Sequence, residues 1–209
     1  MSETELRAFS CVVEARTGEK EGRSLVVEGM PIVFGQQADI GSFYEIILRD
    51  ALERTDMKDV PLFVNHDTSQ VPLARSRNNN QNSTMQLSVG EDGVHILATL
   101  DEKNQRAQEL WSAVKRGDIS GMSFMFRVDG DEWKELESGK PTRTIKSISR
   151  IYEVSAVTYP AYTGTSISAR SLESDDAALD SAKRTLESAR KRKREIDDLN
   201  KRLRKGEAE

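Results

Sequence analysis

The chain has 209 residues, of which 36% are apolar and 32% are charged, and its formal net charge is −4. This length predicts one domain with an appendage, and the absence of an apolar run of about 18 residues argues against a membrane-spanning helix. The opening residues 1–7 lack the basic and then apolar order of a secretory signal. One cysteine, Cys11, cannot form an internal disulfide or a cysteine zinc cluster, so we expect a protein of a reducing cytoplasm.

The first half of the chain predicts several short strands. Alternating apolar and polar residues predict strands over 6–14 and 24–34, joined by a turn at 17–22. Further extended segments cover 40–48, 60–64, 84–89 and 94–100, the last two forming a hairpin. Residues 50–55 predict a short helix with Asp50 as its N-cap.

One clear helix and the final strands follow. Apolar residues at helical spacing predict a helix over 104–116, which Gly117 ends. Residues 129–143 are polar and predict a mobile insertion, after which strands cover about 144–149 and 151–158. Many short strands and one helix in the body predict a mainly β fold with flanking helices, α+β in class, built as a compact antiparallel β-barrel-like domain.

The C-terminal part has a different composition. Residues 163–171 are rich in Gly, Ser and Thr and predict a linker between a domain at 1–162 and a charged helical tail at 172–209. Within the tail, 172–182 has four acids and no base, whereas 183–205 has eleven bases and four acids. Its heptad seam is imperfect, so a coiled coil would be marginal, and the helix is expected to serve self-association or contact with a scaffold. The basic part could attract nucleic acid, but a solvated helix face is the commoner explanation of such a run, so we expect no nucleic-acid role.

The segment 117–126 (GDISGMSFMF) predicts a buried strand with a reactive face. Its period of two places Ser123 on the face opposite to the bulky apolar residues Met122, Phe124, Phe126 and Val128. Gly121 lies two residues earlier on the serine's own face and leaves space beside the hydroxyl. A nucleophilic hydroxyl needs such a rigid backbone, with room for a substrate. Serines on half-exposed strands are common, so an ordinary strand serine is the competing interpretation.

His66 follows directly on the apolar strand 60–64 and begins a polar loop. A histidine at a strand end is held by rigid backbone and remains accessible, as a general base must be. An ordinary surface histidine is the competing interpretation.

Glu153 interrupts an otherwise apolar or small strand, IYEVSAV. A buried carboxylate needs a partner. Orienting an imidazole is one use and a structural salt bridge is another.

These segments together resemble the prohead maturation proteases of tailed bacteriophages, which are distantly similar to the herpesvirus assemblins. The resemblance covers about 25–165 and follows the family's order. It rests on the segments 33–35 (VFG), 40–45 (IGSFYE), 64–67 (VNHD), 72–75 (PLAR), 117–126 (GDISGMSFMF) and 153–161 (EVSAVTYPA). Met125 and Ala74 depart from it, since glycine is frequent at both positions in the family.

The resemblance implies a serine endopeptidase that cleaves scaffold segments of the major capsid protein, and itself, during prohead maturation. It implies Ser123 as nucleophile, His66 as base and Glu153 as the third member, with no metal and no cofactor. Its partners would be the major capsid protein and its scaffold segment. It would act in the bacterial host cytoplasm, inside the assembling procapsid.

Four alternatives stay open. His95 could replace Glu153 as a second histidine of the herpesvirus type, and Ser155 could replace Ser123 as nucleophile. The whole chain could instead be a non-enzymatic capsid scaffold or assembly chaperone. A metal hydrolase using His66, Asp67 and His95 has little support, because the spacing is not that of metal ligands.

Overall fold

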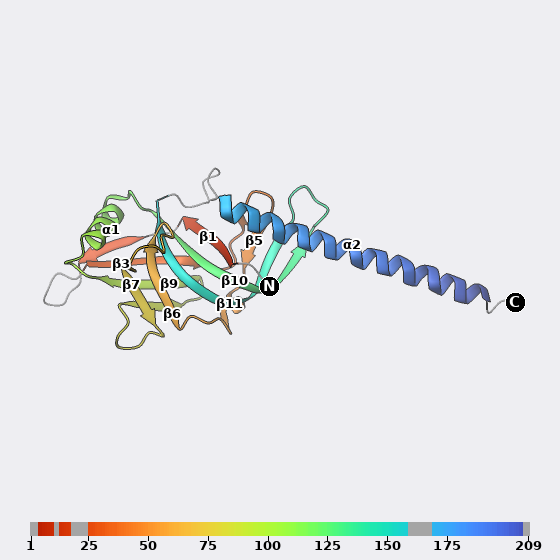
Figure 1. Cartoon of the computed structure of the whole chain (residues 1–209), viewed down its shortest axis with the longest axis horizontal. Helices are drawn as coiled ribbons and strands as arrows, with labels where there is room; N and C mark the ends of the chain where they lie inside the picture. Colours follow the sequence, from red (N-terminus) through yellow and green to blue (C-terminus); the bar gives the residue numbers. More distant parts are fainter. Residues whose placement is uncertain (1–3, 11–12, 18–24, 159–168, 207–209) are drawn as a thin grey trace.

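The computed structural model describes residues 4–10, 13–17, 25–158 and 169–206 (Figure 1). Strands dominate up to residue 157, and a long helix ends the described chain. The elements, in order, are β1 (Thr4–Ser10), β2 (Glu14–Thr17), β3 (Leu25–Val33), β4 (Ala38–Asp39), β5 (Tyr44–Ile47), the 3₁₀ helix η1 (Arg49–Leu52), β6 (Asp59–Val64), β7 (Ala74–Arg77), β8 (Met85–Val89), β9 (Gly93–Leu100), α1 (Gln105–Arg116), β10 (Gly121–Lys134), β11 (Thr142–Val157) and α2 (Ala169–Gly206).

The larger sheet has seven strands and is organised around β11. Its main path runs β1-β10-β11-β5-β4, and β6 joins β11 to β7. The start of β11 pairs with β5 and its end pairs with β6, and both pairings are parallel. The end of β6, where the predicted histidine lies, is therefore brought beside the end of β11.

The smaller sheet is antiparallel and has the order β2-β3-β9-β8. The prediction of a mainly β fold with helices is confirmed, and the predicted hairpin is present as β8 and β9. The described strands form two sheets and close no barrel, and the parallel pairs of β11 make the larger sheet mixed. The pairing is therefore mainly antiparallel, as expected, whereas the barrel-like closure is not found among the described strands.

The main core lies on the apolar face of β10. Met122, Phe124 and Phe126 are fully buried there, as their alternation predicts. They join the inward residues of the smaller sheet and the buried face of α1, whose Ala107, Leu110 and Val114 recur at helical spacing.

Helix α1 has the predicted ends. The side chain of Asn104 accepts a hydrogen bond from the backbone N–H of Arg106, and Gly117 takes the left-handed conformation with φ of 81°. Such a cap pair satisfies backbone groups that the helix itself leaves unpaired.

Four local predictions were wrong. The predicted strand 6–14 is divided between β1, which pairs with β10, and β2, which pairs with β3 across the predicted turn; that turn, 17–22, lies largely outside the described residues. Residues 129–143 are mostly the two arms of the β10–β11 hairpin, and 144–158 is one strand rather than two. Asp50 lies inside η1, whose N-cap position is Leu48. The pairing of β1 depends on a partner strand distant in sequence, which local pattern does not reveal.

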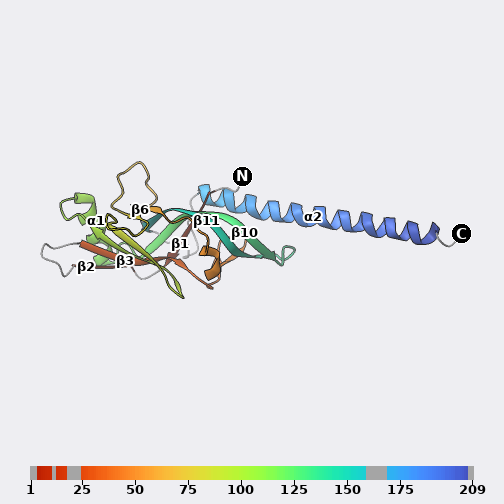
Figure 2. The ribbon, with the colours of Figure 1, turned by 90° about the horizontal axis from the view of Figure 1, so that it is seen from below.

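Helix α2 begins against the larger sheet and then projects beyond the rest of the molecule (Figures 1 and 2). Leu179 is buried with Ala38, Ile40 and Phe43 in a small second cluster. The Asp176 carboxylate accepts a hydrogen bond of 2.8 Å from the hydroxyl of Ser42. The tail therefore contributes to packing at its start. Most of the predicted linker, 163–168, lies outside the described residues.

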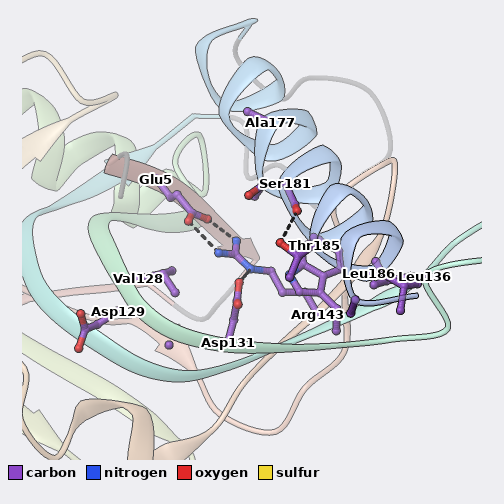
Figure 3. A pocket seen from close by; sticks show the side chains of 15 residues that line it. Glu5, Val128, Asp129, Asp131, Leu136, Arg143, Ala177, Ser181, Thr185 and Leu186 are labelled. Carbon is purple, nitrogen blue, oxygen red and sulfur yellow. Dashed lines mark hydrogen bonds and ion pairs between the residues drawn. The ribbon is translucent and has the colours of Figure 1, made fainter. Parts of the chain in front are cut away.

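A groove of about 740 Å³ separates α2 from the β10–β11 hairpin. Arg143 lies in it between Glu5 and Asp131, facing Ser181 and Thr185 of the helix (Figure 3). None of the predicted catalytic residues lines this groove, so it is separate from the candidate site.

In the described part of the chain, no helix is long and apolar enough to cross a membrane.

Candidate active site

Ser123 lies on β10, on the face opposite to the apolar core, as its place in the alternation predicts. It pairs with Ala8 of β1 on one side and with Ser155 of β11 on the other. Its hydroxyl donates a 2.8 Å hydrogen bond to the main-chain carbonyl of Arg7, and the residue is 1% exposed. The space expected beside the hydroxyl is therefore not open in this conformation.

His66 lies directly after β6 in left-handed backbone. Asn65 and His66 have φ of 50° and 59°, which non-glycine residues adopt rarely and asparagine adopts most readily. The Asn65 side chain accepts a 3.0 Å hydrogen bond from the backbone N–H of Thr158, and the Asn65 N–H donates to the carbonyl of Ala156. The turn is thus held against the end of β11.

Glu153 is the carboxylate that contacts His66. Its Oε1 lies 2.5 Å from His66 Nδ1, and its side chain is 2% exposed whereas the imidazole is 20% exposed. An ionised carboxylate only accepts hydrogen bonds, so this contact assigns the proton to Nδ1. In a neutral imidazole, Nε2 is then left as an acceptor.

The three predicted residues share one face of the larger sheet. Directly paired residues of antiparallel strands point to the same face, so Ser123 and Ser155 do so. Glu153 is two residues from Ser155 along β11, and the His66 ring reaches it over this face. The structure records no hydrogen bond between Ser123 and His66, both of which lie in the described part. Joining them requires the Ser123 hydroxyl to turn away from Arg7.

Ser155 supplies contacts that the sequence did not predict. Its hydroxyl donates to Glu153 Oε2 at 2.7 Å and accepts from the backbone N–H of His66 at 3.2 Å. The one available signal was its spacing of two from Glu153, which places both side chains on the same face.

His95 lies elsewhere, on β9 of the smaller sheet. Its Nε2 is 2.8 Å from a carboxylate oxygen of Asp92, and its side chain is 45% exposed. Glu153, and not His95, therefore contacts His66. Asp67 turns to its own loop, where it accepts from Ser69. No group of three potential metal-binding side chains occurs among the residues described.

A buried ionic network joins side chains of β1 to side chains of β5 and β11. Arg7 donates to Glu45 at 2.5 and 2.8 Å and to Glu5 at 2.8 Å, and Arg143 donates to Glu5 at 2.6 and 3.0 Å. All four residues are at most 6% exposed. Burial raises the pKa of Glu5, but the attraction of Arg7 and the hydrogen bonds from Arg143 outweigh it, so this pKa is below its usual value. The network anchors the strand whose Arg7 carbonyl holds the Ser123 hydroxyl.

Three comparisons with known proteins found similar sequences or structures. The profile of the Caudovirus prohead serine protease family matches residues 11–178. The prohead protease of Enterobacteria phage HK97 is 27% identical over 144 residues, which are 68% of this chain. The aligned part spans 58% of the HK97 protein's own length. The solved structure of the bacteriophage T4 capsid assembly protease matches with a TM-score of 0.44 and 14% identity, covering 76% of this chain and 99% of that one. Since the family profile covers well over half of the sequence, the chain belongs to the Caudovirus prohead serine protease family.

Proposed function

We propose that this protein is a serine endopeptidase that cleaves scaffold segments of the major capsid protein, and itself, during prohead maturation. The observation that carries the proposal is the 2.5 Å contact between His66 and Glu153 on the sheet face that also bears Ser123. A general base oriented by a buried carboxylate beside a hydroxyl is the arrangement that nucleophilic acyl transfer requires. Family membership supports the capsid as the place of action.

The proposed reaction assigns one role to each residue. Ser123 Oγ attacks the carbonyl carbon of the scissile peptide bond while His66 Nε2 takes its proton. The resulting imidazolium, stabilised by Glu153, gives the proton to the leaving amine, and the C–N bond breaks. Water then attacks the acyl-enzyme ester with His66 again as base, which frees the carboxylate product and restores Ser123.

A conformational step precedes this chemistry. In the structure the Ser123 hydroxyl donates to the Arg7 carbonyl and is nearly inaccessible. Rotation of the side chain about its Cα–Cβ bond would direct the hydroxyl away from Arg7 and toward His66. The conformation described here therefore corresponds to a resting state of the proposed enzyme.

The test is expression of the chain alone and beside its capsid protein, followed by mass spectrometry of the products. Ser123→Ala and His66→Asn should both abolish cleavage, because nucleophile and base act as a unit. Asparagine is chosen at 66 because it tolerates the left-handed backbone there. Turnover retained in a folded Ser123→Ala variant would contradict the assignment of the nucleophile.

The same experiment separates the protease from a non-enzymatic scaffold or assembly chaperone. A scaffold would support shell assembly equally well with Ser123→Ala and would leave capsid protein uncut in the wild type. A protease would produce capsid fragments that the variant lacks.

The tail is proposed to direct the protease to the assembling shell. The eleven bases and four acids of 183–205 give this part of the helix a net positive charge, which would attract an acidic partner segment and repel a parallel second copy. Self-association through this helix is the alternative. Self-cleavage is proposed for the Gly, Ser and Thr-rich segment 163–171, and it predicts tail fragments in wild type that are absent from Ser123→Ala.

A further inference from the structure

Ser155 is a buried hydroxyl to which the proposed reaction assigns no role. It lies on β11, two residues from Glu153, and pairs directly with Ser123. The residue is 0% exposed. A buried hydroxyl in this position is either a packing residue, a second nucleophile or part of the support of the base.

The two hydrogen bonds of Ser155 decide among these. Its oxygen accepts the backbone N–H of His66 at 3.2 Å, and its proton goes to Glu153 Oε2 at 2.7 Å. The single donor of the hydroxyl is therefore already used by a carboxylate. One side chain thus connects the backbone of the base to the carboxylate that orients the ring of the same base.

This connection completes the surroundings of Glu153. One carboxylate oxygen contacts His66 Nδ1 and the other receives the Ser155 hydroxyl. With 2% of the side chain exposed, little water is available to replace either partner. Removal of the hydroxyl would leave a buried oxygen unsatisfied, and rotation of the carboxyl group to find another donor would disturb its contact with His66.

The backbone of His66 depends on the same hydroxyl. Its φ of 59° is unusual for a histidine, so the turn is maintained by contacts and not by local preference. The preceding residue, Asn65, is held by its hydrogen bonds with Ala156 and Thr158. The Ser155 hydroxyl holds His66 itself, by accepting a hydrogen bond from its backbone N–H.

We propose that Ser155 is a positioning residue that sets the orientation of the His66–Glu153 pair from both sides. The inference relies on the proposed function for the roles of His66 and Ser123. It assigns Ser155 neither a contact with substrate nor a role as nucleophile.

The first test is spectroscopic and independent of turnover. An imidazole N–H that donates to a carboxylate gives a far-downfield proton resonance, which we expect in the full-length wild type and not in Glu153→Gln. In Ser155→Ala this resonance should broaden or disappear. The matched control is Ser76→Ala, which removes another hydroxyl that is 0% exposed and whose partner is Asn79, outside the candidate site. The downfield resonance of the Ser76→Ala variant should be the same as that of wild type.

The second test uses a fluorophosphonate that labels reactive serines. In wild type the label should be on Ser123. Ser155→Ala should lower the maximal inactivation rate about 10- to 100-fold with the half-saturating concentration unchanged, since misplacement of a catalytic group by about 1 Å costs up to this much. Ser76→Ala should behave as wild type. Ser155→Cys, which keeps the size and a weak donor, should be intermediate and decides the matter if Ser155→Ala does not fold.

The outcomes separate this inference from the proposed function. Wild type that is not labelled at Ser123 contradicts the serine protease itself. Normal labelling of Ser123 in Ser155→Ala, with the downfield resonance intact, contradicts only the role of Ser155. A label on Ser155 in wild type makes it the nucleophile and overturns the inference.

Discussion

The contact between Glu153 and His66 depends on which atom carries the proton. Glu153 is buried and accepts from Nδ1, and this assignment leaves Nε2 as the acceptor that the proposed mechanism uses as base. A glutamine at 153 would be nearly isosteric but could present its amide NH₂ to the ring and favour the opposite tautomer. The function of this residue therefore lies in its charge and acceptor character more than in its size.

We therefore expect Glu153→Gln to reduce cleavage about 10²- to 10⁴-fold while the fold is retained. His95→Ala should have little effect, because His95 lies on the other sheet with Asp92 as its partner. Rates of capsid protein processing in the two variants, at equal amounts of folded protein, provide the measurement. A larger loss in His95→Ala than in Glu153→Gln would favour the pair of histidines.

At the scale of elements, β1 connects the candidate nucleophile to the buried ionic network. Its Arg7 carbonyl accepts from Ser123, while its Glu5 and Arg7 side chains pair with Arg143 of β11 and Glu45 of β5. Burying charged side chains costs desolvation free energy, and the attraction between the ions compensates this cost only while every partner is present. The network therefore fixes β1 against the sheet more than it adds net stability.

Removing one member of this network should be strongly destabilising. Arg143→Met leaves Glu5 and Glu45 with less compensation, and we expect a loss of about 3–5 kcal/mol in the free energy of unfolding. Denaturant titration measures it. The surface control is Arg116→Met, which removes an exposed partner of Asp118 and should cost about 1 kcal/mol or less.

The same network predicts acid sensitivity. The pKa of Glu5 is lowered in the folded protein, so its contribution to stability is fully present above the ordinary value of 4.5 and is lost as pH falls through the folded value. Thermal melts of wild type should show the midpoint falling as the pH is taken below about 4.5. Glu5→Gln should flatten this dependence, and an unchanged slope would contradict the role of Glu5.

At the scale of the whole molecule, α2 has two parts with different environments. Its start is packed through Leu179 against Phe43 and its neighbours, whereas 191–196 are exposed, including Ile196 at 57%. The helix then continues away from the body (Figure 2). Only the first part is therefore expected to affect the stability of the domain.

Two changes should separate these parts. Leu179→Ala should lower the free energy of unfolding by about 2–3 kcal/mol, as the loss of a buried leucine side chain does.

A chain ending at Arg190 should keep stability and peptide hydrolysis but process capsid protein poorly inside assembling particles. Circular dichroism melts and particle mass spectrometry are the measurements. Normal processing by the shortened chain would contradict the targeting role.

The sequence by itself determined most of the strands, helix α1 and the residue types of the candidate site, because these depend on local alternation and capping. The buried face of β10, the place of His66 at a strand end and the burial of Glu153 all follow from patterns within about ten residues. The tertiary structure decided which of these residues meet. His66 and Glu153 are 87 residues apart, and Ser123 and Arg7 are 116 apart. Parallel pairing of β6 with β11 makes the first contact and β1 makes the second, and strand pairing across such separations is encoded in packing and not in any local pattern. The contact of His66 with Glu153 and not with His95, the contacts of Ser155 and the position of the Ser123 hydroxyl were therefore decided by the assembled sheet.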